Sequence, residues 1–399
     1  MNTRERFHAV MGFEPGVRTL RWEFGYWNAT VDRWYTEGLK RSPYSPPPGL
    51  ADGGAHYGEG LPFPYNLGTF RYRDHDIHTL LKMDPGTASI PLNWRFSPPL
   101  REAIIEEDET TQLMINADGV TVRVRKDSAS IPQFVDWPVR DWTTWRQVKE
   151  ERFGLEIMTR FPARWHEVAA SYRQRDYPLG LRMEGFFSIP RELMGIEHQL
   201  LTYYDDPKLM HDINETLATV WLAMLEEVLS WVDLDFVHIW EDMAFKNGPL
   251  ISPLMFKTFL SPYYRRITEF LKMYNIDHIF VDTDGNCWEL IEPFLNAGVR
   301  GLFPFEVQAG MDVVEVRQRF PQLLIQGGLD KVKVAQGKAA IDAELEAKLP
   351  FMLSHGGYIP FLDHLVPPDV SWDNFLHYRE RVNQYIESYP SQLSKGTRK

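Results

Sequence analysis

Cysteine is almost absent from this sequence, and its scarcity excludes several classes of protein. A single cysteine, Cys287, occurs among 399 residues, so neither an internal disulfide bond nor a cysteine-rich zinc module can form. This usage is typical of the reducing cytoplasm, where we expect the protein to be located. The N-terminus has no apolar signal core, and no apolar run approaches membrane-spanning length, so we expect no membrane association.

Positively charged residues are also fewer than negatively charged ones. The chain has 43 lysine and arginine residues against 55 acidic residues, which gives a formal net charge of −12. Proteins that bind nucleic acids normally carry a basic face, so we expect no nucleic-acid partner. Aromatic residues make up 14% of the chain, and some of them should line a large, flat-walled pocket for a small molecule.

A regular alternation of strand-like and helix-like segments begins at about residue 141. This alternation predicts parallel β/α units in series. The chain has no Gly-x-Gly-x-x-Gly turn, which favours an α/β fold of the (β/α)8 TIM-barrel type over a dinucleotide-binding fold. An earlier strand is expected at Thr19–Phe24. The later strand-like segments are residues 179–184, 235–242, 279–281, 301–306, 323–330 and 358–364.

The segments before this alternation are predicted to form an N-terminal extension and an insertion. Residues 110–125 combine two β-rich runs with the turn sequence Asn116–Gly119, which predicts a β-hairpin. We expect residues 65–140 to be an insertion packed on the barrel, within one domain that covers residues 1–399. The polar tail, residues 390–399, is expected to be loose.

Acidic residues follow almost every predicted strand. Asp282 and Asp284 stand at alternate positions after the apolar run 279–281, so in an extended chain their side chains point the same way. The carboxyl ends of the strands of a barrel face one mouth, where barrel enzymes place their chemistry. Each acid could instead cap a helix or be solvated in a loop. The others are Glu23, Glu184, Glu241, Asp242, Glu306, Asp330 and Asp363, and His364 joins them.

Several motifs resemble the uroporphyrinogen decarboxylase superfamily, which includes corrinoid-linked methyltransferases. The resemblance is clearest over residues 178–388, and the opening Arg4–Pro15 is also similar to that of the family. It implies a (β/α)8 barrel, in agreement with the alternation, and suggests a homodimer. The motifs are the segments Trp240–Pro253, Asp282–Asn286, Gly327–Asp330 and Gly356–Asp369.

The sequence departs from the decarboxylase branch of that superfamily. Its members carry an arginine-rich motif for substrate carboxylates, and the matching stretch Arg21–Trp27 has only Arg21 as a basic residue. The central tyrosine of the branch is replaced by Ile196, whereas the C-terminal histidine is retained as His364. A mouth ringed by acids would also repel a polyanionic substrate. Decarboxylation of a porphyrinogen-like or other carboxylated substrate is therefore the alternative rather than the main hypothesis.

The sequence also departs from the thiol-methylating branch, whose His-x-Cys-Gly motif and a later cysteine bind zinc. The matching residues here are Asp282, Asp284 and Gly285, and the position of the later cysteine aligns with His364. The resemblance therefore implies a three-ligand site of Asp282, Asp284 and His364 for zinc or another divalent metal. Oxygen and imidazole ligands can hold such ions. Glu241 could complete the set.

The favoured function is a corrinoid-dependent methyltransferase. It would move a methyl group between a corrinoid (methylcobalamin) and tetrahydrofolate, a thiol, or a methyl ether or amine. The chain has no Asp-x-His-x-x-Gly motif, so a separate corrinoid protein would carry the cofactor. Asp282, Asp284, His364 and Glu241 are the predicted catalytic residues, with an acid managing one proton. A non-catalytic tetrapyrrole-binding or small-molecule-binding protein is the third possibility.

Seven further residues at strand ends are predicted to contact the substrate. Two are tryptophans, which would form aromatic pocket walls, and five are acids. They are Trp22, Glu23, Glu184, Trp240, Glu306, Asp330 and Asp363.

Overall fold

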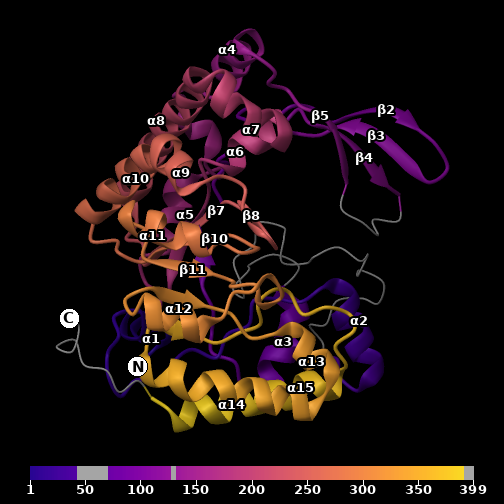
Figure 1. The fold of residues 1–399 in the computed structure, drawn as a ribbon, viewed down its shortest axis with the longest axis vertical. Coiled ribbons are helices and arrows are strands. Elements are labelled where there is room, and N and C mark those ends of the chain that lie inside the picture. Colours follow the sequence, from indigo (N-terminus) through magenta and orange to yellow (C-terminus); the bar gives the residue numbers. More distant parts are fainter. Residues whose placement is uncertain (43–70, 127–131, 391–399) are drawn as a thin grey trace.

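The central feature of the fold is a curled parallel sheet of seven strands, covered on its outer side by helices (Figure 1). The structure is a computed structural model that describes residues 1–42, 71–126 and 132–390. The strand order is β1-β6-β7-β10-β11-β12-β13, so the carboxyl ends of all seven strands meet at one edge. The strands are Ala88–Ser89, Leu179–Glu184, Phe236–Trp240, Ile279–Asp282, Gly301–Phe303, Leu324–Gln326 and Tyr358–Ile359.

Helices connect each strand of this sheet to the next. The longest, α8 (Pro207–Trp231), begins where Asp206 accepts a hydrogen bond from the Leu209 N–H, and proline occupies its first turn. No helix in the described ranges is long and apolar enough to cross a membrane. The remaining α-helices are Thr3–Met11 (α1), Asn28–Glu37 (α2), Arg71–Leu80 (α3), Trp142–Arg152 (α4), Trp165–Ser171 (α5), Ser188–Met194 (α6), Ile196–Asp205 (α7), Pro253–Phe259 (α9), Ser261–Met273 (α10), Trp288–Asn296 (α11), Val313–Arg319 (α12), Lys331–Gln336 (α13), Lys338–His355 (α14) and Trp372–Ser388 (α15).

Alternate side chains of the strands pack on opposite sides of the curled sheet. Val237 and Ile239 of β7 belong to the large core between sheet and helices. Phe236 belongs to a second, largely aromatic core inside the curl, which also contains Phe280 and Phe303. This period of two follows from strand geometry, and it decides which side chains can reach the mouth.

The strand predicted at Thr19–Phe24 is present as an extended segment without strand pairing. Its Arg21 carbonyl accepts a hydrogen bond from Asp84 N–H at 3.2 Å, on the β1 side of the sheet. On the β13 side, Thr19 Oγ1 donates to the Tyr358 carbonyl at 2.5 Å. Nearby, the Gly25 carbonyl accepts from Val366 N–H at 2.9 Å. The α/β class and the parallel sheet are confirmed, whereas the described residues pair seven strands rather than the eight of a closed barrel.

A separate antiparallel sheet of four strands projects from the body of the molecule (Figure 1). It consists of β2 (Ala103–Glu107), β3 (Thr111–Ile115), β4 (Thr121–Arg125) and β5 (Gln133–Asp136). The predicted hairpin is confirmed by the β3–β4 pairing. Within the predicted insertion 65–140, β1 belongs instead to the main sheet. Parts of that range, and residues 391–399 of the predicted loose tail, lie outside the described residues.

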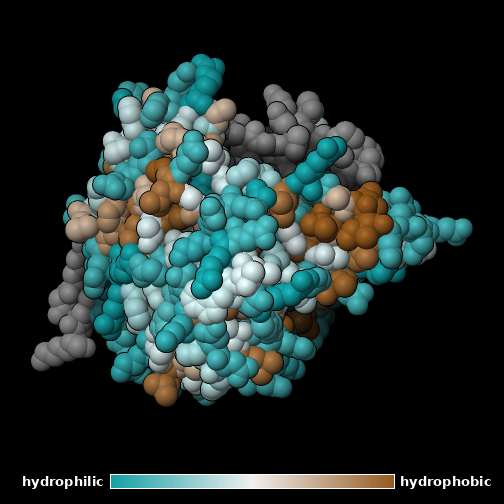
Figure 2. Space-filling view, turned by 90° about the horizontal axis from the view of Figure 1, so that it is seen from above, coloured by the Kyte–Doolittle hydropathy of each residue, from teal (hydrophilic) through white to brown (hydrophobic). Residues whose placement is uncertain are grey.

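The projecting sheet carries apolar side chains on its surface. Figure 2 shows a brown patch on the side of the molecule where this sheet projects. Ile104, Ile105, Phe134 and Val135 are all more than two-fifths exposed. The root of the sheet reaches the mouth, because Asp118 in the β3–β4 turn forms an ion pair with Arg95 at 3.0 Å.

Candidate active site

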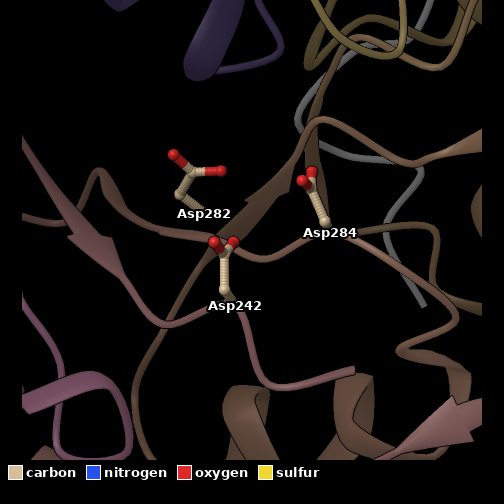
Figure 3. Close-up of side chains that lie close together, drawn as sticks. All are labelled: Asp242, Asp282 and Asp284. Carbon is tan, nitrogen blue, oxygen red and sulfur yellow. The ribbon is translucent and has the colours of Figure 1, made fainter. Parts of the chain in front are cut away.

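Three aspartates meet at the carboxyl ends of β7 and β10. Asp282 is the last residue of β10, Asp284 follows two residues later, and Asp242 lies two residues past β7 (Figure 3). One carboxylate oxygen from each lies within 4.8 Å of the others. The two strands are neighbours, with Trp240 paired to Asp282, and this pairing carries the three residues to one place.

The backbone around these aspartates is held tightly. Asp242 has a φ of +45°, a left-handed conformation that is rare outside glycine and clusters at functional sites. Gly285 has a φ of +74°, and a Cβ there would lie 2.4 Å from the Ala244 carbonyl oxygen. Only glycine fits this turn. The loop after β10 is therefore pressed against β8 (Ala244–Phe245), which fixes the direction of Asp284.

Burial makes the three carboxyl groups weak acids. Loss of solvent raises the pKa of Asp282 to about 7, although the guanidinium of Arg182, 3.8 Å away, opposes the shift. The pKa of Asp284 rises to about 8, first through burial and then through the charges of Asp242, Asp282 and Glu306. Burial also raises the pKa of Asp242. Like charges this close cannot all ionise, so the cluster retains protons at neutral pH.

His364 joins the site as a neutral imidazole. Its Nε2 lies 3.5 Å from Asp284 Oδ2, and its ring lies 5.3 Å from that of Phe24. Burial lowers its pKa to about 4, and the charge of Lys331 adds to this effect. The structure places Asp284 near both Asp282 and His364, but the compact three-residue group contains Asp242 in place of the histidine, and metal binding stays a prediction.

Basic residues offset much of the negative charge at the mouth, which the prediction of a repelling acidic ring did not include. Arg95 pairs with Glu184 at 2.9 Å, and its guanidinium lies over the Trp240 ring at 5.7 Å. Arg191 lies over the same ring at 5.0 Å. With Arg182 and Lys331, four cations surround the carboxylates. The mouth is therefore not uniformly acidic.

Glu241, predicted to be catalytic, holds the backbone instead. It has no exposed surface, and its carboxylate accepts hydrogen bonds from the N–H groups of residues 186–188 at 2.8–3.0 Å and from the Tyr264 hydroxyl at 2.5 Å. A Cβ on Gly185 would lie 2.0 Å from its carboxyl carbon. Burial raises the pKa of Glu241 to about 7. These contacts use its acceptor capacity, and the neighbouring Asp242 takes the place at the mouth.

Three of the acids predicted to bind substrate also stabilise the fold through hydrogen bonds or ion pairs. Glu23 accepts from Leu362 N–H at 2.9 Å and pairs with the fully buried Arg379 at 3.4 Å. Asp363 accepts from the N–H groups of Val307 and Lys331. Asp330 caps α13. Acids at strand ends are also good helix and loop caps, which explains why the pattern included them.

The remaining predicted substrate residues divide between core and mouth. Trp22 is 3% exposed within the interior aromatic core, and its Nε1 donates to the Pro85 carbonyl at 2.8 Å. This position corrects its assignment as a pocket wall. Trp240 and Glu184 line the mouth beside Arg95, and Glu306 accepts from Gly285 N–H at 3.1 Å and pairs with Lys331.

The sequence interpretation missed the basic residues of the site. Arg182 and His238 occupy paired positions on β6 and β7, and both side chains retain partial exposure inside the curl. Strict alternation along β6 places Arg182 on the same side as Glu184, so the pattern did contain this signal. No comparable signal marks Arg95 or Arg191, which come from a loop and a helix.

The donor atoms at the mouth suit a hard or borderline divalent cation. Carboxylate oxygens and an imidazole nitrogen are ligands for zinc, manganese or iron. Cys287 is buried and does not belong to the group of donor atoms that meet at the aspartate cluster. The residues present therefore fit a metal held by oxygen, and not the thiolate site of the thiol-methylating enzymes.

Known proteins share sequence and fold features with this chain. The family model described as uroporphyrinogen decarboxylase (URO-D) matches residues 111–385. No curated protein sequence matches the chain. The structure of a methyltransferase from Methanosarcina mazei is similar with a TM-score of 0.58 and 13% identity, over 96% of this chain and 99% of that one. This similarity concerns the fold.

Two methionine synthase structures are more distantly similar. A putative vitamin-B12-independent methionine synthase from Listeria monocytogenes aligns over 55% of this chain and 69% of its own, with a TM-score of 0.34 and 14% identity. A B12-independent methionine synthase from a Shewanella species aligns over 78% and 84%, with a TM-score of 0.39 and 10% identity. Similarity at this level adds nothing to the assignment of the site.

Proposed function

The chain belongs to the uroporphyrinogen decarboxylase (URO-D) family, and on this premise we propose that it is a corrinoid-linked methyltransferase. It would move a methyl group between a corrinoid and a small acceptor or donor. The observation that carries the proposal is the aspartate cluster Asp242, Asp282 and Asp284, which holds protons at neutral pH at the carboxyl ends of two neighbouring strands. A chain of similar fold is described as a methyltransferase.

Methyl transfer from oxygen or nitrogen requires a proton at the atom that loses the methyl group. The corrinoid, when bound, supplies the chemistry that accepts or donates the methyl group. When a methylated heteroatom is the donor, the electron pair of the broken bond stays on that atom, which takes a proton from Asp284. When a protonated heteroatom is the acceptor, it loses its proton to the Asp284 carboxylate. General acid–base catalysis of this kind works best with a pKa near the working pH.

We propose different roles for the two aspartates of the Asp-Thr-Asp segment, because their surroundings differ. Arg182 favours the charged form of Asp282 against the like charge of Asp242, whereas Asp242, Asp282 and Glu306 favour the neutral form of Asp284 against the charge of Lys331. Of two neighbouring carboxyl groups, the one with more like charges around it keeps its proton more readily. Asp284 is then the proton donor, Asp282 is the anion, and the neutral His364 orients Asp284 from 3.5 Å.

The same residues could hold a divalent metal in place of the retained proton. Asp242, Asp282 and Asp284 would supply oxygen ligands, with His364 beside them. A bound zinc ion would stabilise the negative charge of a leaving or attacking atom. Elemental analysis of the purified protein beside Asp284→Ala and His364→Ala variants tests this. Stoichiometric metal lost in both variants supports the metal site, and a metal-free wild type assigns the cluster to proton chemistry.

The corrinoid is proposed to arrive on a separate protein. The projecting sheet has an exposed apolar surface, and the Asp118–Arg95 ion pair connects this sheet to the mouth. Exposed apolar surfaces often mark interaction sites, which supports a protein partner. The extended segment 19–26 lies between the β1 and β13 sides of the sheet, and we propose that it takes the place of the eighth strand and encloses the reacting groups. Free methylcobalamin is the simplest probe of the activity.

The decisive assay follows the visible spectrum of methylcobalamin after mixing with the protein and tetrahydrofolate, a thiol, or a methylated ether or amine. Demethylation with one acceptor, or methylation from one donor, supports the proposal, and the absence of a change with every one of them refutes it. Binding of methylcobalamin or tetrapyrrole without any turnover would identify a carrier protein instead.

Decarboxylation is the second candidate, and the basic residues of the mouth favour it. Arg182, Arg191 and Lys331 could hold substrate carboxylates, which the sequence alone did not indicate. The electron pair of the broken carbon–carboxylate bond would stay on the substrate, and Asp284 would protonate the carbon that loses carbon dioxide. Release of carbon dioxide from a porphyrinogen, without methylcobalamin turnover, distinguishes this function.

A further inference from the structure

A groove opens between three helices of the layer that covers the sheet. Helices α9 and α10 form one wall and α11 forms the other, and the three pack against one another (Figure 1). The groove has a volume of about 610 Å³, which is within the usual range for small-molecule sites. We call it the helix groove. None of the residues that line it belongs to the mouth, so it is a separate site.

Proline residues interrupt the helices on both sides of the helix groove. Pro262 in the first turn of α10 has no N–H for a helical hydrogen bond, and the helical run breaks at Leu260 between α9 and α10. Pro293 lies inside α11 and likewise cannot donate to the carbonyl four residues earlier. Helices interrupted in this way do not close against each other along their whole length, which leaves room for the groove.

The base of the helix groove is aromatic and fixed by packing. The side chain of Phe256 is fully buried, and its ring centroid lies 4.7 Å from that of Phe294 on α11. The same ring is stacked with Tyr264 of α10 at 5.8 Å. These contacts join all three helices beneath the groove. The groove is therefore a preformed cavity with an apolar base.

The two walls carry opposite charges that do not meet. Lys257 of α9 and Arg265 of α10 line one wall, and carboxylates of α11, Glu292 among them, line the other. All three of these side chains are exposed, and none forms an ion pair with another residue of the described ranges. A ligand of a single charge would be repelled by one wall. A ligand that carries both charges would find a partner on each.

A buried hydroxyl group also lines the helix groove. Ser261 at the start of α10 is 8% exposed, and its hydroxyl makes no hydrogen bond within the part of the chain that is described. By contrast, Ser252 and Ser371 are N-caps of α9 and α15, and each accepts a hydrogen bond from its own helix. A buried polar atom without a partner is costly, so native proteins keep one mainly where a ligand or water completes it.

The spacing of the walls indicates how far apart the two charges of the ligand must be. The axes of packed helices lie about 8–10 Å apart, so a ligand that reaches both walls needs well-separated charges. A free amino acid holds its ammonium and carboxylate groups within about 3 Å of each other. Each residue of an extended peptide adds about 3.5 Å, so two or three residues separate the terminal charges by about 7–10 Å.

We propose that the helix groove binds a short zwitterionic peptide of two or three residues. The terminal carboxylate of the peptide would lie at Lys257 and Arg265, and its terminal ammonium group at Glu292. An amide group between them would form a hydrogen bond with the Ser261 hydroxyl, and an apolar side chain would pack on Phe256. This binding goes beyond the proposed methyl transfer and does not depend on it, because no residue of the groove takes part in that chemistry.

Calorimetry on the full-length protein tests the two charges. The probes are dialanine and trialanine, the same peptides with an acetylated N-terminus or an amidated C-terminus, and free alanine. Arg265→Gln and Glu292→Gln each remove one charge from a wall. Lys272→Gln and Glu269→Gln are the matched controls, because both side chains are exposed on α10 and neither lines the groove.

The wild type should bind at least one of the two unmodified peptides. Each blocked peptide should bind about tenfold more weakly, because it loses a charge-assisted hydrogen bond. Free alanine should also bind more weakly, because it cannot reach both walls. Arg265→Gln and Glu292→Gln should weaken binding of the unmodified peptide about threefold to tenfold, and the two control variants should bind it as the wild type does.

A second pair of variants tests the hydroxyl group. Ser261→Ala should leave the Tm of the free protein unchanged, because the hydroxyl has no partner there, and should weaken peptide binding about threefold. Ser371→Ala removes the hydrogen bond to Asn374 N–H at the start of α15, so it should lower Tm by a few degrees and leave peptide affinity unchanged.

Several results would overturn the proposal. They are no binding of either unmodified peptide by the wild type, equal affinity for the blocked peptides, and equal losses of affinity in the groove and control variants. A fall in Tm for Ser261→Ala as large as that for Ser371→Ala would remove the hydroxyl from the site. The methylcobalamin assay is run without peptide, so its outcome decides the proposed function separately from peptide binding.

Discussion

Two buried aspartates at opposite ends of neighbouring strands have pKa values shifted in opposite directions. Asp235 precedes β7 at the amino end of the sheet and is 2% exposed, and Asp282 ends β10 at the carboxyl end and is 6% exposed. Burial raises the pKa of both. At Asp235, hydrogen bonds from His8, Leu179 and Arg4, with the charge of Arg175, outweigh burial and lower the pKa.

Asp282 has much weaker compensation, because its basic neighbour Arg182 is 3.8 Å away and Asp242 adds a like charge. The same residue type is therefore a stable anion at one end of the sheet and part of a cluster that retains protons at the other. Barrel folds divide their ends in this way, with stability at the amino end of the strands and chemistry at the carboxyl end. Four experiments test this difference between the two ends of the sheet.

The largest effect is expected from Asp284→Ala. Loss of the proton donor should lower kcat/KM for methyl transfer by about 10²- to 10⁴-fold, the usual range for general acid–base catalysis. The unfolding transition should remain cooperative, because Asp284 is not a core residue. Glu289→Gln, an exposed change on the helix after the same strand, is the control. Equal activity of the two variants would remove Asp284 from the mechanism.

Asp235→Asn should have the largest effect on stability. The buried Arg175, which lies 2.9 Å from Asp235, would lose its counter-charge. Breaking one side of a buried pair costs about 3–5 kcal/mol of unfolding free energy. Urea unfolding measures the change. Asp373→Asn, which breaks an exposed pair with Lys338, should stay within about 0.5 kcal/mol. Equal losses of unfolding free energy in the two variants would show that the buried Asp235–Arg175 pair stabilises the fold no more than an exposed ion pair does.

The two ends should respond to pH with opposite sign. Asp235 has a lowered pKa, so its stabilisation is present at neutral pH and is lost as the pH falls through acidic values. Asp284 has a pKa raised to about 8, so the folded protein binds the extra proton and loses stability as the pH rises from about 4 towards 8.

Asp284→Asn should therefore raise Tm by a few degrees at pH 9 and leave it unchanged at pH 4. Scanning calorimetry between these values follows the difference, which should grow up to pH 8 and then stay constant. His364→Gln is a useful companion, because it removes the neighbour but keeps the titrating carboxyl group. A pH-independent difference between Asp284→Asn and wild type would mean that Asp284 titrates normally.

The smallest effect is expected from Asp242→Asn. Removing this like charge should move the alkaline limb of the pH–rate profile to lower pH, because Asp242 is the strongest charged contributor to the raised pKa of Asp284. Asparagine also tolerates the left-handed backbone at this position. Glu306→Gln should shift the limb in the same direction but less. A larger shift for Glu306→Gln would contradict the arrangement of charges at the mouth.

The structure agrees with the predicted placement of two aspartates, where alternation alone decides the geometry. We predicted that the side chains of Asp282 and Asp284 lie together, because alternate residues of an extended chain point the same way. Glu241 and Asp242 are consecutive, and the pattern could not show which one turns to the mouth. The left-handed backbone at Asp242 and the amide groups of residues 186–188 settle that question, and both depend on long-range packing.

Periodicity and strand direction were enough to predict the parallel β/α class, the hairpin, and the meeting of acids at one edge of the sheet. Which of these acids remain available depends on contacts that the folded chain makes. Glu23 and Asp363 accept hydrogen bonds from backbone N–H groups of distant parts of the chain, and Glu23 also pairs with Arg379. Asp330 caps its own helix and accepts from the Gln308 carboxamide. Burial and charge are properties of the whole fold, so the raised pKa of Asp284 arises only where β7, β10 and their loops come together.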